Sequence, residues 1–207
     1  METIISKFLT KKRNEERKTQ LHNKNFTLLS SNCTAGVIYH DLGLKFISPT
    51  INLWFSPNDY IKFLTNLPYY LSTNCLVEDI ETDKNYPVGI LGESENKIRL
   101  YFQHYSSFQI AKLKWNQRKK RVNLNNLYVI MTDRDGATKN DLIDFDNLPY
   151  KNKIILTCKK YDYLKNQYVI RNCVENDHLG NIFKKNLLSG KSKLDTFNFI
   201  EFINRPN

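Results

Sequence analysis

The most constraining feature of the chain is a continuous apolar run, LYVIM at residues 127–131, followed at once by a polar loop and a helical pattern. A strand with apolar side chains on both faces must be covered on both faces, as central strands of parallel or mixed sheets are. Helical patterns alternate with further strand-like segments, at 26–30, 51–55, 76–81, 97–103 and 154–156. The alternation predicts an α/β fold, a single-domain layered α/β/α sheet that is predominantly parallel or mixed, with an antiparallel pair as an option in the 76–103 region.

The chain has 207 residues, 41% of them hydrophobic, which suits one compact domain with a sizeable core. We expect a basic N-terminal helical arm over 1–24 and a single α/β domain over 25–207. In the arm, apolar residues lie on one helical face ahead of a basic run; they are Ile4, Ile5, Phe8 and Leu9. Such a helix either packs on its own domain or touches a membrane surface or a partner.

No segment approaches the ~20 consecutive apolar residues of a membrane-spanning helix, and the N-terminus does not follow the pattern of a secretory signal. We therefore expect a cytoplasmic protein, with a peripheral position at the inner face of the membrane as an option for the arm. The four cysteines are widely spaced, without a CxxC pair or a cluster with histidine, which favours reduced thiols over disulfides or structural zinc.

The charge balance favours anionic partners. Lys and Arg number 31 against 21 Asp and Glu, a formal net charge of +10. An anionic small molecule or glycan is the expected ligand class, although solubility alone also explains such a charge. Nucleic acid is unlikely on this pattern, because the chain has no RNA-recognition, zinc-finger or helix-turn-helix signature.

One candidate site combines Cys33, His104 and Asp133, each expected directly after a strand. A cysteine at a helix start sits where backbone N–H groups and the helix dipole favour a thiolate. In that site Cys33 would attack, His104 would accept its proton, and Asp133 would orient the imidazole, in the chain order of papain-like thiol enzymes. The alternative is an inert, buried cysteine.

A second candidate is the sequence Thr132-Asp133-Arg134-Asp135-Gly136, where Asp133 and Asp135 could hold Mg²⁺ or Mn²⁺ bridging a nucleotide-sugar diphosphate. The competing interpretation is ordinary turn chemistry, with Asp bonding its own backbone and Gly at positive φ. The sequence leaves the cofactor unknown, with Mg²⁺ or Mn²⁺ as the option that this pair suggests.

A third candidate is the basic helix expected over 107–121, whose residues 112–121 carry six cations and no acid. Mutual repulsion of these charges is relieved by a bound anion, so Arg118 and Arg121 are candidate ligands for a diphosphate, beside Asn32 in the same substrate site. Trp115, at helical spacing from Phe108 and Ala111, is expected in the core.

The stretches around these residues, SSNCTAGVIYHDLGLKFISPTINLWFSPNDYIKFLTNLPYY, YPVGILG, LYFQHYSSFQIAKLKWNQRKKRVNLNNLYVIMTDRDGAT and FDNLPYKNKIILT, resemble a bacterial family known as domain of unknown function number 1919. Its members are commonly labelled exopolysaccharide or capsule biosynthesis proteins. The resemblance implies an α/β fold and a role in making or modifying surface polysaccharide, but assigns no catalytic residues. Family members often carry a more Gly-rich segment after the cysteine, where this chain has Thr34-Ala35-Gly36.

Residues and resemblance together predict a transferase, glycosyl or acyl, acting on an activated sugar or a growing glycan. Two alternatives remain open. The first is a non-catalytic scaffold that binds an anionic ligand or another protein of the same pathway, and the second is a papain-like thiol acyltransferase or hydrolase.

Overall fold

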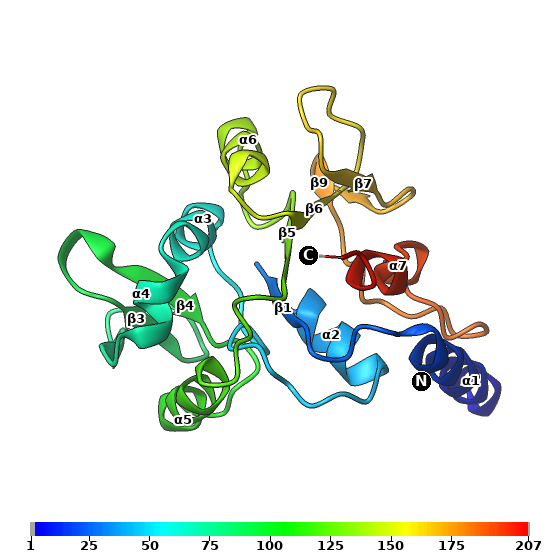
Figure 1. Cartoon of the computed structure of the whole chain (residues 1–207), viewed down its shortest axis with the longest axis horizontal. Helices are drawn as coiled ribbons and strands as arrows, with labels where there is room; N and C mark the ends of the chain where they lie inside the picture. The colour runs from blue at the N-terminus through cyan, green and yellow to red at the C-terminus, as the bar shows by residue number, and fades with distance from the viewer. Residues whose placement is uncertain (1–2, 207) are drawn as a thin grey trace.

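The centre of the molecule is a parallel sheet of four strands, shown in Figure 1 for a computed structural model that describes residues 3–206. The strands pair in the order β1-β5-β6-β7, each parallel to its neighbour. They are β1 (Thr27–Ser30), β5 (Leu127–Thr132), β6 (Asn152–Thr157) and β7 (Gln167–Val169). The predicted α/β fold class is confirmed, because the apolar run 127–131 lies in β5, between β1 and β6.

Helices cover both faces of this sheet. Leu29 and Met131 belong to one hydrophobic core, while Leu28 and Ile130, their neighbours in sequence, belong to the other. The helices of the first core are α3 (Pro57–Thr65), α5 (Phe108–Lys119) and α6 (Lys139–Asn147); those of the second are α2 (Thr34–Asp41) and α7 (Phe199–Ile203). The period of two in the buried strands therefore produces the predicted three layers, helix over sheet over helix.

Polar side chains set where several helices begin. Ser56 caps α3 by accepting from the N–H of Asp59, and Pro57 follows it in the first turn. Ser107 caps α5 in the same way. At α6, Thr138 and Asp141 form a reciprocal capping box. The basic helix expected over 107–121 is confirmed as α5, and the helical pattern expected after the polar loop that follows 127–131 is confirmed as α6.

A smaller antiparallel sheet lies beside the first core. It consists of β2 (Leu76–Glu78), β3 (Val88–Leu91) and β4 (Ile98–Tyr101), and it follows the short helix α4 (Leu67–Ser72). The antiparallel option for the 76–103 region is therefore confirmed. This sheet and α3 to α5 form an insertion between α2 and β5, which Figure 1 shows on one side of the central sheet.

The segment 51–55, predicted as a strand, forms only an isolated bridge. Trp54 exchanges both backbone hydrogen bonds with Tyr101 of β4, whereas the next residue, Phe55, donates to Ser31 at the end of β1. Because consecutive residues bond to different sheets, no ladder extends along the segment. It joins the edge of the small sheet to the edge of the central one, and the space above this junction becomes the candidate site.

The remaining elements lie near the C-terminal part of the chain. They are α1 (Ile4–Gln20), the hairpin of β8 (Val174–Glu175) and β9 (His178–Leu179), and the 3-10 turn Leu194–Thr196. A further 3-10 turn, Ser94–Asn96, connects β3 to β4 in the insertion. The N-terminal arm is thus a helix, as predicted, and it packs against residues 187–195. Within residues 3–206, no helix combines the length and apolarity that crossing a bilayer requires.

Candidate functional site

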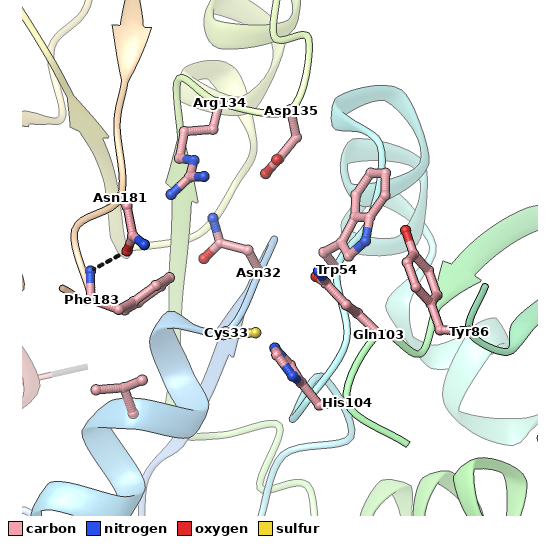
Figure 2. Close-up of a pocket in the computed structure, with 11 residues that line it drawn as sticks. Asn32, Cys33, Trp54, Tyr86, Gln103, His104, Arg134, Asp135, Asn181 and Phe183 are labelled. Carbon is pink, nitrogen blue, oxygen red and sulfur yellow. Dashed lines mark hydrogen bonds between the residues drawn. The ribbon is translucent and has the colours of Figure 1, made fainter. Parts of the chain in front are cut away.

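A cleft of about 550 Å³ opens where β1 and β5 end, beside the junction of the two sheets (Figure 2). Ligands of α/β proteins bind at the carboxyl ends of parallel strands, and ligand pockets typically measure ~300–1,000 Å³. The residues that line it come from six segments of the chain: Asn32, Cys33 and Val37; Trp54; Tyr86; Gln103 and His104; Arg134 and Asp135; and Asn181 and Phe183. The cleft therefore has the position and size of a small-molecule site.

Asn32 ties the two strand ends together at the floor of the cleft. Its amide nitrogen donates to the Thr132 hydroxyl at 2.9 Å, and its amide oxygen accepts from the Thr34 hydroxyl at 2.7 Å. Its side chain also lies beside the Asp135 carboxyl, whose ionised form it favours (Figure 2). Asn32 is buried and lines the cleft, which is consistent with its predicted place in the site.

Cys33 and His104 meet in the cleft although 70 residues separate them. Cys33 precedes α2 and His104 follows β4, and Figure 2 shows the imidazole pointing toward the sulfur. Burial, reinforced by the Asp135 carboxylate and opposed by Arg134, raises the pKa of the Cys33 thiol to about 11. At neutral pH the group is therefore a thiol, which lacks the ready thiolate expected of a helix-start nucleophile.

Asp133 does not join them. Its carboxylate is fully buried and accepts from the N–H of Cys158 at 2.9 Å, the N–H of Leu179 at 2.8 Å and the Tyr161 hydroxyl at 3.2 Å. This corrects the expectation that Asp133 orients His104. The side chain instead pins the ends of β5, β6 and β9 to one another, because buried N–H groups need an acceptor.

Asp135, two residues further on, does reach the cleft. It has a positive φ of 60° in the turn after β5, and Figure 2 shows its carboxyl beside Asn32. Desolvation within the cleft raises the pKa of this carboxyl, against the opposing effects of Arg134 and the Asn32 amide. Arg134 is itself anchored, because its guanidinium donates to the carbonyl of Gly180 at 2.9 Å. The Asp135 carboxyl and the Arg134 guanidinium, which carry opposite charges when ionised, therefore both face the cleft.

The turn after β5 separates Asp133 from Asp135, the two carboxylates predicted to hold a metal ion. Asp133 has its oxygens engaged with backbone N–H groups, so Asp135 is the carboxylate that remains for a cation in the cleft. Over residues 3–206, no group of three or more His, Cys, Asp and Glu side chains is placed to hold a metal ion. This corrects the expectation that Asp133 and Asp135 share a cation.

The sequence predicted that Arg118 and Arg121 bind a diphosphate, but both side chains contact other parts of the protein instead. Arg118 is buried, donates to the Tyr105 hydroxyl at 2.6 Å and lies 5.1 Å from the ring centre of Phe46. Arg121 donates to the carbonyl of Phe46 at 3.0 Å. Neither lines the cleft, which corrects their assignment as substrate ligands. Backbone carbonyls and an aromatic face relieve their charge, so no bound anion is required.

An aromatic wall was not anticipated from the sequence. Trp54 stacks on Tyr101 with ring centres 3.9 Å apart, and it lines the cleft with Tyr86 (Figure 2). The sequence does contain a pattern that indicates the position of Trp54. In an extended segment alternate side chains point to opposite sides, so Trp54 faces away from the core in which Leu53 and Phe55 are buried. Tyr86 carried no comparable pattern, because a loop before β3 brings it to the cleft.

The Cys33 thiol offers a first test. We expect iodoacetamide to modify it slowly at neutral pH, with a pH profile centred near 11, and Asp135→Asn to accelerate modification several-fold at mildly alkaline pH by removing a neighbouring negative charge. Peptide mass spectrometry across a pH series measures the rate, with Cys173 as internal reference. Preferential labelling of Cys33 at neutral pH would instead favour a thiol enzyme.

Comparison with known proteins shows which family the chain belongs to. The chain matches the family described as Domain of unknown function (DUF1919) over residues 4–204. It is also 39% identical over 191 residues to an uncharacterized protein of Haemophilus influenzae, in an alignment that covers 92% of this chain and 90% of that protein. Both matches span the central sheet, the insertion and the C-terminal segments that build the cleft. The chain therefore belongs to the DUF1919 family.

Proposed function

We propose that the protein is a transferase that acts on an activated sugar or a growing glycan, with the cleft at the ends of β1 and β5 as its active site. The observation that carries the proposal is the combination, in one cavity, of an aromatic wall with a carboxyl of raised pKa and an anchored arginine. The family resemblance suggests exopolysaccharide or capsule biosynthesis as the process it serves.

The lining suits the two halves of an activated sugar. Trp54 and Tyr86 offer apolar ring faces for the sugar ring or the base, while the amides of Gln103 and Asn181 are donors and acceptors for hydroxyl groups. Arg134 supplies the positive charge that a phosphate requires. Small-molecule sites combine apolar walls with a few polar groups in this manner.

In the proposed reaction, Asp135 acts as general base. It takes the proton of an acceptor hydroxyl while that oxygen bonds to the anomeric carbon, and the bond from that carbon to the phosphate oxygen breaks. The electron pair of the broken bond leaves with the nucleoside diphosphate, whose negative charge Arg134 stabilises. A raised pKa makes the Asp135 carboxylate a stronger base than an ordinary one.

The donor set of the cleft limits how a divalent cation could take part. Mg²⁺ is commonly held by one or two carboxylates together with substrate phosphates and waters. Asp135 is the carboxylate that lines the cleft, and a cation bound to it would lower the basicity that the proposed reaction requires. In that reaction Mg²⁺ or Mn²⁺ would instead be held by the diphosphate and waters. Such a cation would neutralise charge on the leaving group.

A second candidate function is thiol-dependent acyl transfer, which the meeting of Cys33 and His104 favours. Cys33 would attack an acyl carbonyl while His104 accepts the thiol proton and passes it to the displaced group. An acceptor hydroxyl would then attack the thioester, its proton would pass through His104 to the sulfur, and the bond between Cys33 and the acyl group would break. The raised pKa of the thiol makes this the weaker of the two.

Ligand binding tests the proposal. Isothermal titration calorimetry with UDP-, GDP- and dTDP-sugars should reveal a ligand, and Trp54→Ala should weaken its binding roughly tenfold through loss of an aromatic contact. Trp54→Phe should retain most of the affinity because it keeps a ring. Tyr163→Ala, which removes an exposed aromatic side chain outside the cleft, is the matched control. Equal affinity in Trp54→Ala and the wild type would reject the cleft as the sugar site.

A further inference from the structure

Helix α1 packs on the domain through its polar face. Arg13 and Arg17 form ion pairs with Asp195 at 3.4 and 2.7 Å, and Arg13 also donates to the carbonyl of Gly190 at 3.0 Å. Ser6, about two turns before Arg13 on the same face, is fully buried. A Cβ at Gly190 would come within 2.6 Å of the Ser6 carbonyl oxygen, so the close approach depends on this glycine. The helix is thus held in one orientation.

That orientation turns the apolar face of α1 outward. The exposed fractions are 88% for Ile4, 68% for Ile5 and 66% for Phe8. Surface helices of globular proteins normally bury such a face against the core. The expected amphipathic helix is therefore confirmed with its polar side inward. Within residues 3–206, its apolar side has no partner.

A second exposed apolar pair lies beside the start of α1. The Thr3 hydroxyl donates to the carbonyl of Leu187 at 3.1 Å, and the side chains of Leu187 and Leu188 are 57% and 76% exposed. Figure 1 shows α1 at the outer edge of the molecule, next to the orange loop before α7. We call this surface the helix-loop tip, made of Ile4, Ile5, Phe8, Leu187 and Leu188.

Basic residues surround the helix-loop tip. Exposed lysines lie on both of its segments: Lys7, Lys11 and Lys12 on α1, and Lys184 and Lys191 on the loop. The sequence has no acidic residue in 3–14 or in 182–194. A hollow of about 670 Å³ beside the loop is also lined by Lys184, Lys191 and Lys193, and its one acid, Asp195, is neutralised by Arg13 and Arg17.

We propose that the helix-loop tip binds the surface of an anionic lipid bilayer. Its apolar side chains would enter the boundary between headgroups and acyl chains, while the lysines contact anionic headgroups. A bilayer fits better than a second copy of the chain, because two copies of so basic a surface would repel each other. It also fits better than an apolar protein groove, which would leave the surrounding lysines without negative partners. This proposal is independent of the proposed transferase activity.

Flotation of the full chain with vesicles tests the proposal. We expect binding to phosphatidylcholine vesicles that contain phosphatidylglycerol, weak binding to phosphatidylcholine alone, and loss of binding as salt rises. Ile4→Ser combined with Phe8→Ser should weaken binding at least about tenfold, because two apolar side chains no longer leave water. Lys11→Gln and Lys12→Gln should each weaken it roughly fivefold.

Matched controls lie on α5, away from the tip. Ile110→Ser combined with Leu113→Ser removes two other exposed apolar side chains, and this variant should bind vesicles like the wild type. The tip residues are exposed, so circular dichroism should show unchanged folding in every variant. Absence of binding to anionic vesicles, or equal loss in the α5 control, would overturn the proposal. So would a dimer in sedimentation velocity that only the tip variants dissociate, because the surface would then serve a second copy of the chain.

Discussion

Asp133→Asn is expected to lower the free energy of unfolding by about 3 kcal/mol, because the substitution places an amide donor among three groups that donate to the native carboxylate. The Asp133 side chain is fully buried, so water cannot replace the lost acceptor. Burial, followed by the nearby carboxylate, raises the pKa of Tyr161, which keeps that hydroxyl protonated as a donor. For a chain of this length the melting temperature should fall by about 10 °C.

Differential scanning calorimetry and urea unfolding measure this loss. Asp162→Asn, which alters an exposed carboxylate paired only with Lys160, should change stability by no more than about 0.5 kcal/mol. If Asp133→Asn kept wild-type stability, Asp133 would not be the anchor of the three strand ends. The thiol-enzyme triad drawn from the sequence would then deserve renewed testing.

Asp135→Asn is expected to reduce the rate of sugar transfer by about 10²–10⁴-fold, the typical contribution of a general base. Stability should change little, because the Asp135 side chain lies at the cleft and closes no strand end. The base must be ionised, so the wild-type rate should fall as pH decreases through the pKa of Asp135. Since that pKa is raised, the fall should begin at a higher pH than for an ordinary carboxyl.

The assay is release of nucleoside diphosphate from the sugar nucleotide that calorimetry identifies. Asp144→Asn, an exposed carboxylate on α6, is the matched control and should retain the wild-type rate. A variant that loses its affinity for the donor would show a binding role for Asp135. Full activity in Asp135→Asn would remove it from the mechanism and leave Cys33 and His104 as the candidates in this cleft.

Local chemistry made most of the fold predictable. The run 127–131 could only be a covered strand, and Thr138 with Asp141 supplied a helix start directly after the following turn. The segment 51–55 was harder, because its apolar pattern is that of a strand while its backbone bonds alternate between two sheets. Which sheet each of these backbone groups bonds to depends on how the two sheets approach each other, and no local sequence pattern encodes that approach.

The candidate site was predictable only in part, because residues distant in sequence complete it. Cys33 and His104 do share a cleft, as their places after strands indicated. The two carboxylates of the DRDG turn diverge because the positive φ of Asp135 redirects the chain after Asp133. The sequence predicted that Arg118 binds an anion, but Arg118 donates to the Tyr105 hydroxyl and the Ile51 carbonyl. Both partners are distant from Arg118 in sequence, so no local pattern indicates these contacts.

The indole N–H signals of the two tryptophans test the central claim most directly. Trp54 lines the cleft, whereas Trp115 is only 1% exposed in the core. In ¹⁵N-labelled protein, with signals assigned through Trp54→Phe, titration with a UDP-, GDP- or dTDP-sugar should shift the Trp54 indole signal and leave the Trp115 signal in place. An unmoved Trp54 signal when calorimetry shows the protein saturated with that ligand would contradict the cleft as the site of an activated sugar.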